Sequence, residues 1–147
     1  MAECKNIMVY VETAEGNPVK VGLEMLSPAK KLADKVTAVV IGGGVADAAK
    51  EVAKAGADQV ICVDSEDYKE FNLDAYAQVL VELVKEENPE AVFVGGTQDG
   101  KDIAPVVAAK CNTFCDLCFD HIISYFYFFG YNFTLSWVFH FLECSGT

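Results

Sequence analysis

KVTAVVIGGGVADAAKEVAKAGADQVICVD, residues 35–64, contains one complete strand–helix–strand unit. Val36 to Ile41 is almost continuously apolar, as expected for a strand that is covered on both faces of a parallel sheet. Gly42, Gly43 and Gly44 then turn the chain into a helix with apolar residues at helical spacing, and Gly56 suits a left-handed cap. A second apolar strand follows over residues 59–63.

The same alternation continues on both sides of this segment. Before it, the pattern predicts a strand over residues 6–12, a turn at 15–18 and a helix over 21–34. After it, the pattern predicts a helix from a cap at Asn72 or Asp74 to Glu87, and a strand over 91–94. Four strand–helix units with short links predict an α/β fold with a doubly wound parallel sheet and right-handed crossovers.

Two prolines bear on the helix boundaries. Pro28 falls inside the first predicted helix, where Ser27 as a cap would let the helix restart with a kink. The fourth helix is predicted to start near Lys101 or Asp102, which would place Pro105 in its opening turn, where proline is tolerated.

Charge narrows the possible partners. The 147 residues include 22 acidic and 11 basic side chains, giving a formal charge of −11. Such a surface repels phosphate backbones and anionic membranes, which argues against nucleic-acid binding, whereas it could attract a basic patch on a protein partner. No basic or apolar leader precedes the first strand, so we expect a cytoplasmic protein with Cys4 and Cys62 reduced.

Two glycine-rich loops follow predicted strands. The run Gly42 to Gly44 lacks the third glycine of a dinucleotide fingerprint, because Asp47 stands at that position, so we interpret the run as a tight turn. The loop after residue 94 lies at the sheet edge where ligands bind, and its candidate anion-binding residues are Gly95, Gly96, Thr97, Gly100 and Lys101. Asp99 and Asp102 oppose phosphate there, so a structural turn and a ligand or partner contact both remain open.

The character of the sequence changes near Phe114. Residues 121–142 contain no Asp, Glu, Lys or Arg and are rich in aromatic side chains. We therefore divide the chain into an α/β domain, residues 1–113, and an atypical, irregular aromatic tail, residues 114–147. A frameshift, gene fragment or mis-spliced end is favoured for this tail, because the local patterning stops abruptly. A membrane anchor and a genuine fifth strand with a hydrophobic partner surface are the alternatives.

Four tail residues have the spacing of a metal or cluster site. Cys111, Cys115 and Cys118 match the cluster motif of radical S-adenosylmethionine enzymes, and His121 would complete a Cys3His zinc set. Only 29 residues follow Cys118, too few for the barrel that such enzymes need, so we interpret the thiols as a chance pattern.

No catalytic constellation is predicted. Both histidines, His121 and His140, lie in the tail, so a His-activated nucleophile in the α/β domain is excluded. Asp64, Glu66, Asp67 and Glu70 form an acidic loop that is interpreted as a solvated connection, in preference to an acid–base pair or a cation site.

Several segments in the same order resemble the alpha subunit of electron transfer flavoproteins. They are NIMVYVET, VGLEMLSPAKKLAD, KVTAVVIGGG, AKAGADQVICVD, DAYAQVLVELVKEENPEAVFVGGT and GKDIAPVVAAK, which together cover about residues 5–113. The resemblance implies the amino-terminal domain of that subunit, with a Rossmann-like, three-layer fold of the adenine-nucleotide-hydrolase-like type.

The resemblance also implies a role. Members of the family are heterodimers that carry electrons from dehydrogenases, and this domain would scaffold the alpha subunit and contact the beta subunit. The FAD of the family is held mainly by a separate carboxyl-terminal domain that this chain lacks, so no cofactor is expected on the chain alone. The alternative is a stand-alone nucleotide-binding module similar to universal stress proteins. Gly96-Thr97 is weakly similar to the end of the phosphate-binding loop of those proteins.

Overall fold

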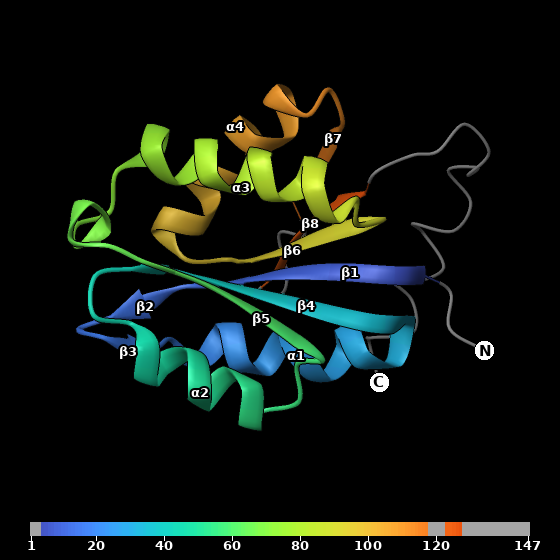
Figure 1. Ribbon diagram of the computed structural model, residues 1–147. Helices are drawn as coiled ribbons and strands as arrows, with labels where there is room; N and C mark the ends of the chain where they lie inside the picture. The colour runs from blue at the N-terminus through green and yellow to red at the C-terminus, as the bar shows by residue number, and fades with distance from the viewer. Residues whose placement is uncertain (1–3, 118–122, 128–147) are drawn as a thin grey trace.

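The computed structural model describes residues 4–117 and 123–127, which form an α/β fold of three layers (Figure 1). Four parallel strands make the centre of one sheet, in the order β5-β4-β1-β6. These strands are β1 (Cys4–Val11), β4 (Ala33–Gly42), β5 (Gln59–Asp64) and β6 (Ala91–Gly95). Their ranges and parallel pairing confirm the predicted doubly wound sheet.

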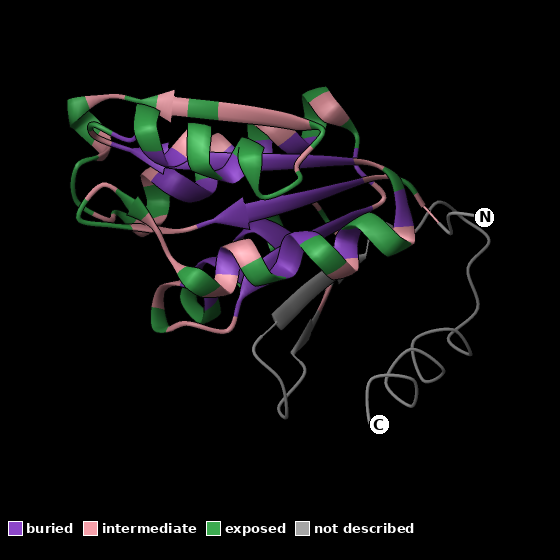
Figure 2. Cartoon of the chain, turned by 90° about the horizontal axis from the view of Figure 1, so that it is seen from below, coloured by how far each residue is buried: buried purple, intermediate pink, exposed green. Residues whose placement is uncertain are grey.

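Helices cover both faces of the sheet, as Figure 1 shows. α1 (Lys20–Leu32) and α2 (Ala46–Lys54) pack on one face, and α3 (Leu73–Glu87) and α4 (Gln98–Lys110) pack on the other. The alternation of β1 explains this, because Val9 and Val11 point to the first pair whereas Met8 and Tyr10 point to the second. Figure 2 shows the result, with buried central strands and helices buried on their inner sides.

The start of α4 differs from the prediction. The helix begins at Gln98, three residues before Lys101, because Thr97 is its N-cap and accepts a hydrogen bond from the amide of Gly100 at 3.0 Å. Pro105 therefore lies in the middle of the helix and not in its opening turn. α1 likewise runs unbroken from Lys20 to Leu32 with Pro28 inside it, so Ser27 does not start a new helix.

The predicted turn at residues 15–18 is a small hairpin. β2 (Thr13–Ala14) pairs with β3 (Asn17–Pro18), and Glu15 and Gly16 between them both have positive φ. A two-residue turn of this kind matches the twist of the strands that it joins. The acidic loop contains a short 3-10 helix, η1 (Glu66–Tyr68), which Ser65 caps.

The described part of the aromatic tail extends the sheet. β8 (Ile123–Tyr127) pairs antiparallel with β6, and β7 (Phe114–Leu117) pairs antiparallel with β8. These two segments are therefore regular strands in the same sheet, and the remaining tail residues lie outside the described part. Within the described residues, no helix has both the length and the apolar character needed to cross a bilayer.

Candidate functional site

The candidate site lies where β1 and β6 end side by side. From β1 the chain passes through α1 to β4 on one side, whereas β6 lies on the other side of β1. Parallel sheets bind ligands at such a point, because the loops that leave the two strands diverge there. Glu12 follows β1 at this edge, and the loop Gly95-Gly96-Thr97 leads from β6 into α4.

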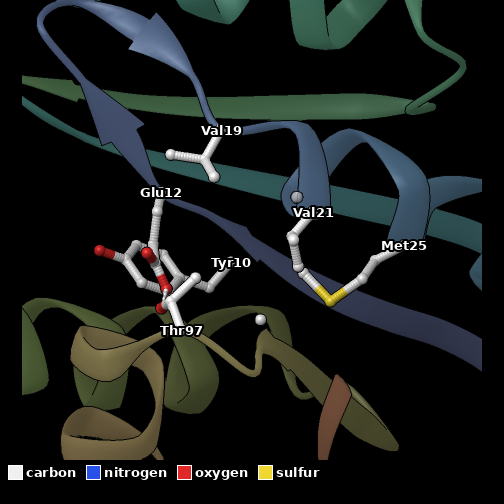
Figure 3. Close-up of a pocket in the computed structure, with 8 residues that line it drawn as sticks. Tyr10, Glu12, Val19, Val21, Met25 and Thr97 are labelled. Carbon is white, nitrogen blue, oxygen red and sulfur yellow. Dashed lines mark hydrogen bonds between the residues drawn. The ribbon is translucent and has the colours of Figure 1, made fainter. Parts of the chain in front are cut away.

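A hydrogen bond joins the two strand ends. The Thr97 hydroxyl donates to Oε1 of Glu12 at 2.5 Å, and the same oxygen of Thr97 accepts from the amide of Gly100. Thr97 therefore caps α4 and binds the end of β1 at the same time. Figure 3 shows the Glu12 carboxylate and Thr97 directed toward one another.

Close backbone packing fixes this arrangement. A Cβ atom on Gly100 would lie 1.9 Å from the carbonyl oxygen of Gly95 and 3.0 Å from Oε1 of Glu12. A Cβ atom on Gly95 would lie 2.9 Å from Cγ1 of Val21, on the first turn of α1. Both glycines are therefore required by packing, and the first turn of α4 rests directly on the end of β6.

A shallow surface depression lies beside Glu12, and its lining side chains leave no room in it for even a water molecule. Its lining consists of Tyr10, Glu12, Val19, Val21, Gly22, Met25, Gly95 and Thr97. In Figure 3, Val21 and Met25 face the Glu12–Thr97 pair from the other side. Pockets for small organic ligands typically hold about 300–1,000 Å³, so this depression is not a nucleotide site.

The electrostatics of the site are dominated by unneutralised acid groups. Burial raises the pKa of Glu12 above its ordinary value, the hydrogen bond from Thr97 opposes this, and the Asp99 carboxylate raises the pKa further. Burial, followed by the nearby charge of Glu12, also raises the pKa of the Tyr10 hydroxyl well above its ordinary range. A second anion such as phosphate would be repelled here.

The structure brings most of the predicted loop residues together at this edge. Gly95, Thr97 and Gly100 lie within the packing around Glu12, and Gly96 joins the first two. Lys101 is exposed on α4. Anion binding by these residues remains a prediction. Sequence reasoning missed Glu12, although a charged residue directly after an apolar strand at the ligand-binding edge was a usable signal.

The other glycine loop is filled by the protein itself. The amide of Gly44 donates to the Asp64 carboxylate at 2.7 Å, and a Cβ on Gly43 would lie 3.2 Å from the Cα of Lys69. Asp64 therefore has a specific structural partner, which the interpretation of the acidic loop as a solvated connection did not include. The tight turn expected for Gly42 to Gly44 fits this geometry.

The predicted cysteine set is only partly described. Cys111 is the C-cap of α4 and Cys115 lies on β7, whereas Cys118 and His121 lie outside the described residues. Burial raises the pKa of the Cys111 thiol, which disfavours the thiolate that a metal needs. Within residues 4–117 and 123–127, no group of three His, Cys, Asp or Glu side chains could hold a metal ion.

Comparison with protein families gives a match over residues 7–115 to the electron transfer flavoprotein domain. The chain belongs to the electron transfer flavoprotein family. The match covers β4, β5 and β6 in full, β1 from Ile7 onward and both glycine loops, and it includes Glu12 and Thr97. The resemblance inferred from the sequence is thereby confirmed.

Individual relatives agree with this assignment. The chain is 37% identical over 116 residues to an electron transfer flavoprotein subunit alpha of Clostridium acetobutylicum, covering 76% of this chain and 34% of the relative. It is 43% identical over 102 residues to the same subunit of Syntrophomonas wolfei, covering 69% and 32%. It is 38% identical over 113 residues to the acryloyl-CoA reductase electron transfer subunit beta of Anaerotignum propionicum, covering 74% and 31%.

The chain spans about a third of the length of these curated relatives. It is therefore an electron transfer flavoprotein domain of the alpha-subunit type. The alternative of a nucleotide-binding stress-protein module is not favoured by these relatives.

Proposed function

We propose that this domain is a flavin-free scaffold that docks on a beta-type electron transfer subunit. The observation that carries the proposal is that the protein's own side chains fill the edge of the sheet where parallel sheets usually bind ligands. Glu12 and Asp64 each occupy a glycine loop there, and the depression between the strands is too small for a nucleotide. Because the protein's own carboxylates close this edge of the sheet, we infer that the domain contacts a partner protein and does not bind a nucleotide there.

In this proposal, electrons pass between dehydrogenases and acceptors through flavins held by other domains of the complex. The chain contributes position and electrostatics, and it carries no catalytic group of its own. The acidic surface, with a net charge of −11, would steer a basic face of the partner subunit toward it.

Co-expression of the chain with the beta-type subunit of the same organism tests the proposal. We expect a 1:1 complex in light scattering, and we expect the isolated chain to show no visible flavin absorbance. Stoichiometric flavin on the isolated chain, or micromolar AMP binding in calorimetry, would contradict the scaffold role and support the nucleotide-binding alternative. Failure to form a complex would contradict the docking role.

A further inference from the structure

β5 forms one border of the six-stranded sheet. Figure 1 shows it in front, beside β4, and none of the described strands pairs with its outer side. Natural proteins protect such borders with short strands, charged side chains or proline, because an open row of amides and carbonyls can pair with another chain. β7, at the opposite border, has four residues and contains Asp116. β5 has six residues, and from Gln59 to Val63 it contains neither a charged side chain nor a proline.

Hydrogen bonds at the two ends of β4 show which of its residues face β5. The carbonyl of Gly42 accepts from the amide of Ser65 at 3.0 Å. Val36 bonds to Asp58 through both of its backbone groups, since its amide donates to the carboxylate and its carbonyl accepts from the amide. Alternate residues of a strand direct their backbone groups to the same side, so the even-numbered residues of β4 face β5.

The register then identifies the open backbone groups of β5. Val40 of β4 is the register partner of Cys62. In a parallel ladder a residue bonds to the two residues that flank its partner, so Val40 bonds to Ile61 and Val63. The backbone groups of Val60 and Cys62 therefore face the open border. The side chain of Cys62 is exposed there.

The charges at the two ends of β5 differ in sign. Lys54 ends α2 just before the strand begins, and Lys30 pairs with Asp58 at the same end. Where the strand ends, Asp64 and the two acidic residues of η1 outnumber Lys69. An antiparallel alignment of two copies brings the acidic end of one strand beside the lysines of the other, whereas a parallel alignment brings like charges together. Charge complementarity along the strand therefore favours a second, antiparallel copy of this chain.

We propose that two copies of this chain pair through β5 in antiparallel orientation, around a two-fold axis at Ile61. This register sets Val60 of one copy opposite Cys62 of the other, so that the open backbone groups of both copies meet. Ile61 then faces its own counterpart, and the charged ends of the strand lie outside. Both copies use the same surface, so the contact closes at a dimer. The dimer is independent of the docking role proposed above, and either can fail without the other.

Amide hydrogen exchange of the full chain at increasing concentration tests the surface directly. The mass from light scattering should rise to that of a dimer, and the amides of Val60 and Cys62 should become protected over the same concentrations. The amides of Ile61 and Val63 are internal controls, because β4 already protects them in a single copy. A chain that stays monomeric, or a dimer that protects another surface, would overturn the proposal. Protection of Val60 and Cys62 only after addition of the beta-type subunit would overturn the second copy as the occupant.

Cys62→Pro and Cys62→Ser form a matched pair of variants. Proline is tolerated at a border position whose amide faces outward, but it removes the donor that pairing requires. Serine keeps the amide and removes only the thiol. Because each copy loses one hydrogen bond, we expect Cys62→Pro to weaken the dimer by roughly tenfold or more and Cys62→Ser to leave it within about twofold. Equal dimerisation of the two variants would contradict the pairing.

An engineered disulfide tests the register and does not depend on the folding of the proline variant. Facing residues in a non-hydrogen-bonded antiparallel pair lie about 4.5 Å apart at Cα, within the range of about 4.4–6.8 Å that disulfides span. In a Cys62→Ser background, Ile61→Cys should form an intermolecular crosslink on mild oxidation, mapped to position 61 by mass spectrometry. Val63→Cys in the same background should not, because position 63 faces Gln59 of the other copy. Crosslinking at both positions, or at neither, would overturn the two-fold axis at Ile61.

Discussion

The hydroxyl of Thr97 lies 2.5 Å from Oε1 of Glu12 and so ties the N-cap of α4 to the end of β1. Two segments 85 residues apart in the chain are joined by this contact. The contact leaves a carboxylate in a partly buried place, where its charge is costly. Measurements of unfolding stability in variants of Glu12 and Thr97 should reveal that cost.

Glu12→Gln should make the domain more stable at neutral pH. Because burial raises the pKa of Glu12 in the folded chain, its contribution to stability is fully present below the unfolded-chain pKa and is lost as pH rises through the folded-state pKa. Glutamine does not ionise, so the advantage of the variant should grow from about pH 4 toward pH 7. Urea unfolding at a series of pH values measures this, with the exposed Glu51→Gln as control; a constant difference across pH would contradict it.

Thr97→Ala should cost more stability than Asn72→Ala, although both remove a helix N-cap. Asn72 only caps α3 through the amide of Ala75, so its loss should cost about 1 kcal/mol. Loss of Thr97 also leaves the Glu12 carboxylate without its donor, which adds about 1–3 kcal/mol. Denaturant unfolding compares the two, and Thr97→Ser should restore most of the loss because it keeps the hydroxyl.

Gly100→Ala should be strongly destabilising despite its helical position. The new Cβ would lie 1.9 Å from a backbone carbonyl that cannot move away easily, so a loss of about 3 kcal/mol or more is expected. Gly44→Ala serves as control, because its positive φ costs about 1–2 kcal/mol while no atom lies within 4 Å. Thermal unfolding of both variants shows which one loses more stability. If Gly100→Ala loses no more stability than Gly44→Ala, the prediction is wrong and α4 can shift on β6.

Asp58→Asn should weaken the domain above pH 4 and less so below it. The Lys30 ammonium, followed by the backbone amide of Val36, lowers the pKa of Asp58. A lowered pKa adds stability that is present above the unfolded-chain value and is lost as pH falls through the folded-state value. Asp34→Asn, which removes an exposed charge from β4, is the matched control variant in the same urea series.

The sequence predicted the sheet well because its signals are local and repeated. Val36 to Ile41 lies within one strand, and Asn72 caps α3 as its side chain suggested. The start of α4 was missed because Thr97, although a favourable N-cap residue, is followed by a polar and glycine-containing segment that was interpreted as a loop. The second role of Thr97 is a hydrogen bond to Glu12, which lies far away in the chain. Propensity cannot register a contact of that kind.

The site was predicted only in part for a similar reason. The glycines after residue 94 were predicted to form either a structural turn or a ligand or partner contact, and in the folded chain their neighbours are the backbone and a carboxylate of the same chain. Asp64 likewise appeared as one of several acidic residues in a loop, and only the folded chain places it on the amide of Gly44. Long-range partners decide whether a glycine loop is open or closed.

The antiparallel pairing of β8 with β6 decides which backbone groups this sheet shows to other chains. β6 is Ala-Val-Phe-Val-Gly and is buried throughout, so without β8 its outer row of amides and carbonyls would offer an apolar template for intermolecular pairing. With the hairpin in place, the four-residue β7 forms the border instead. The strands after α4 therefore cover the hydrogen-bonding edge of a fully buried strand and leave a shorter strand at the border of the sheet.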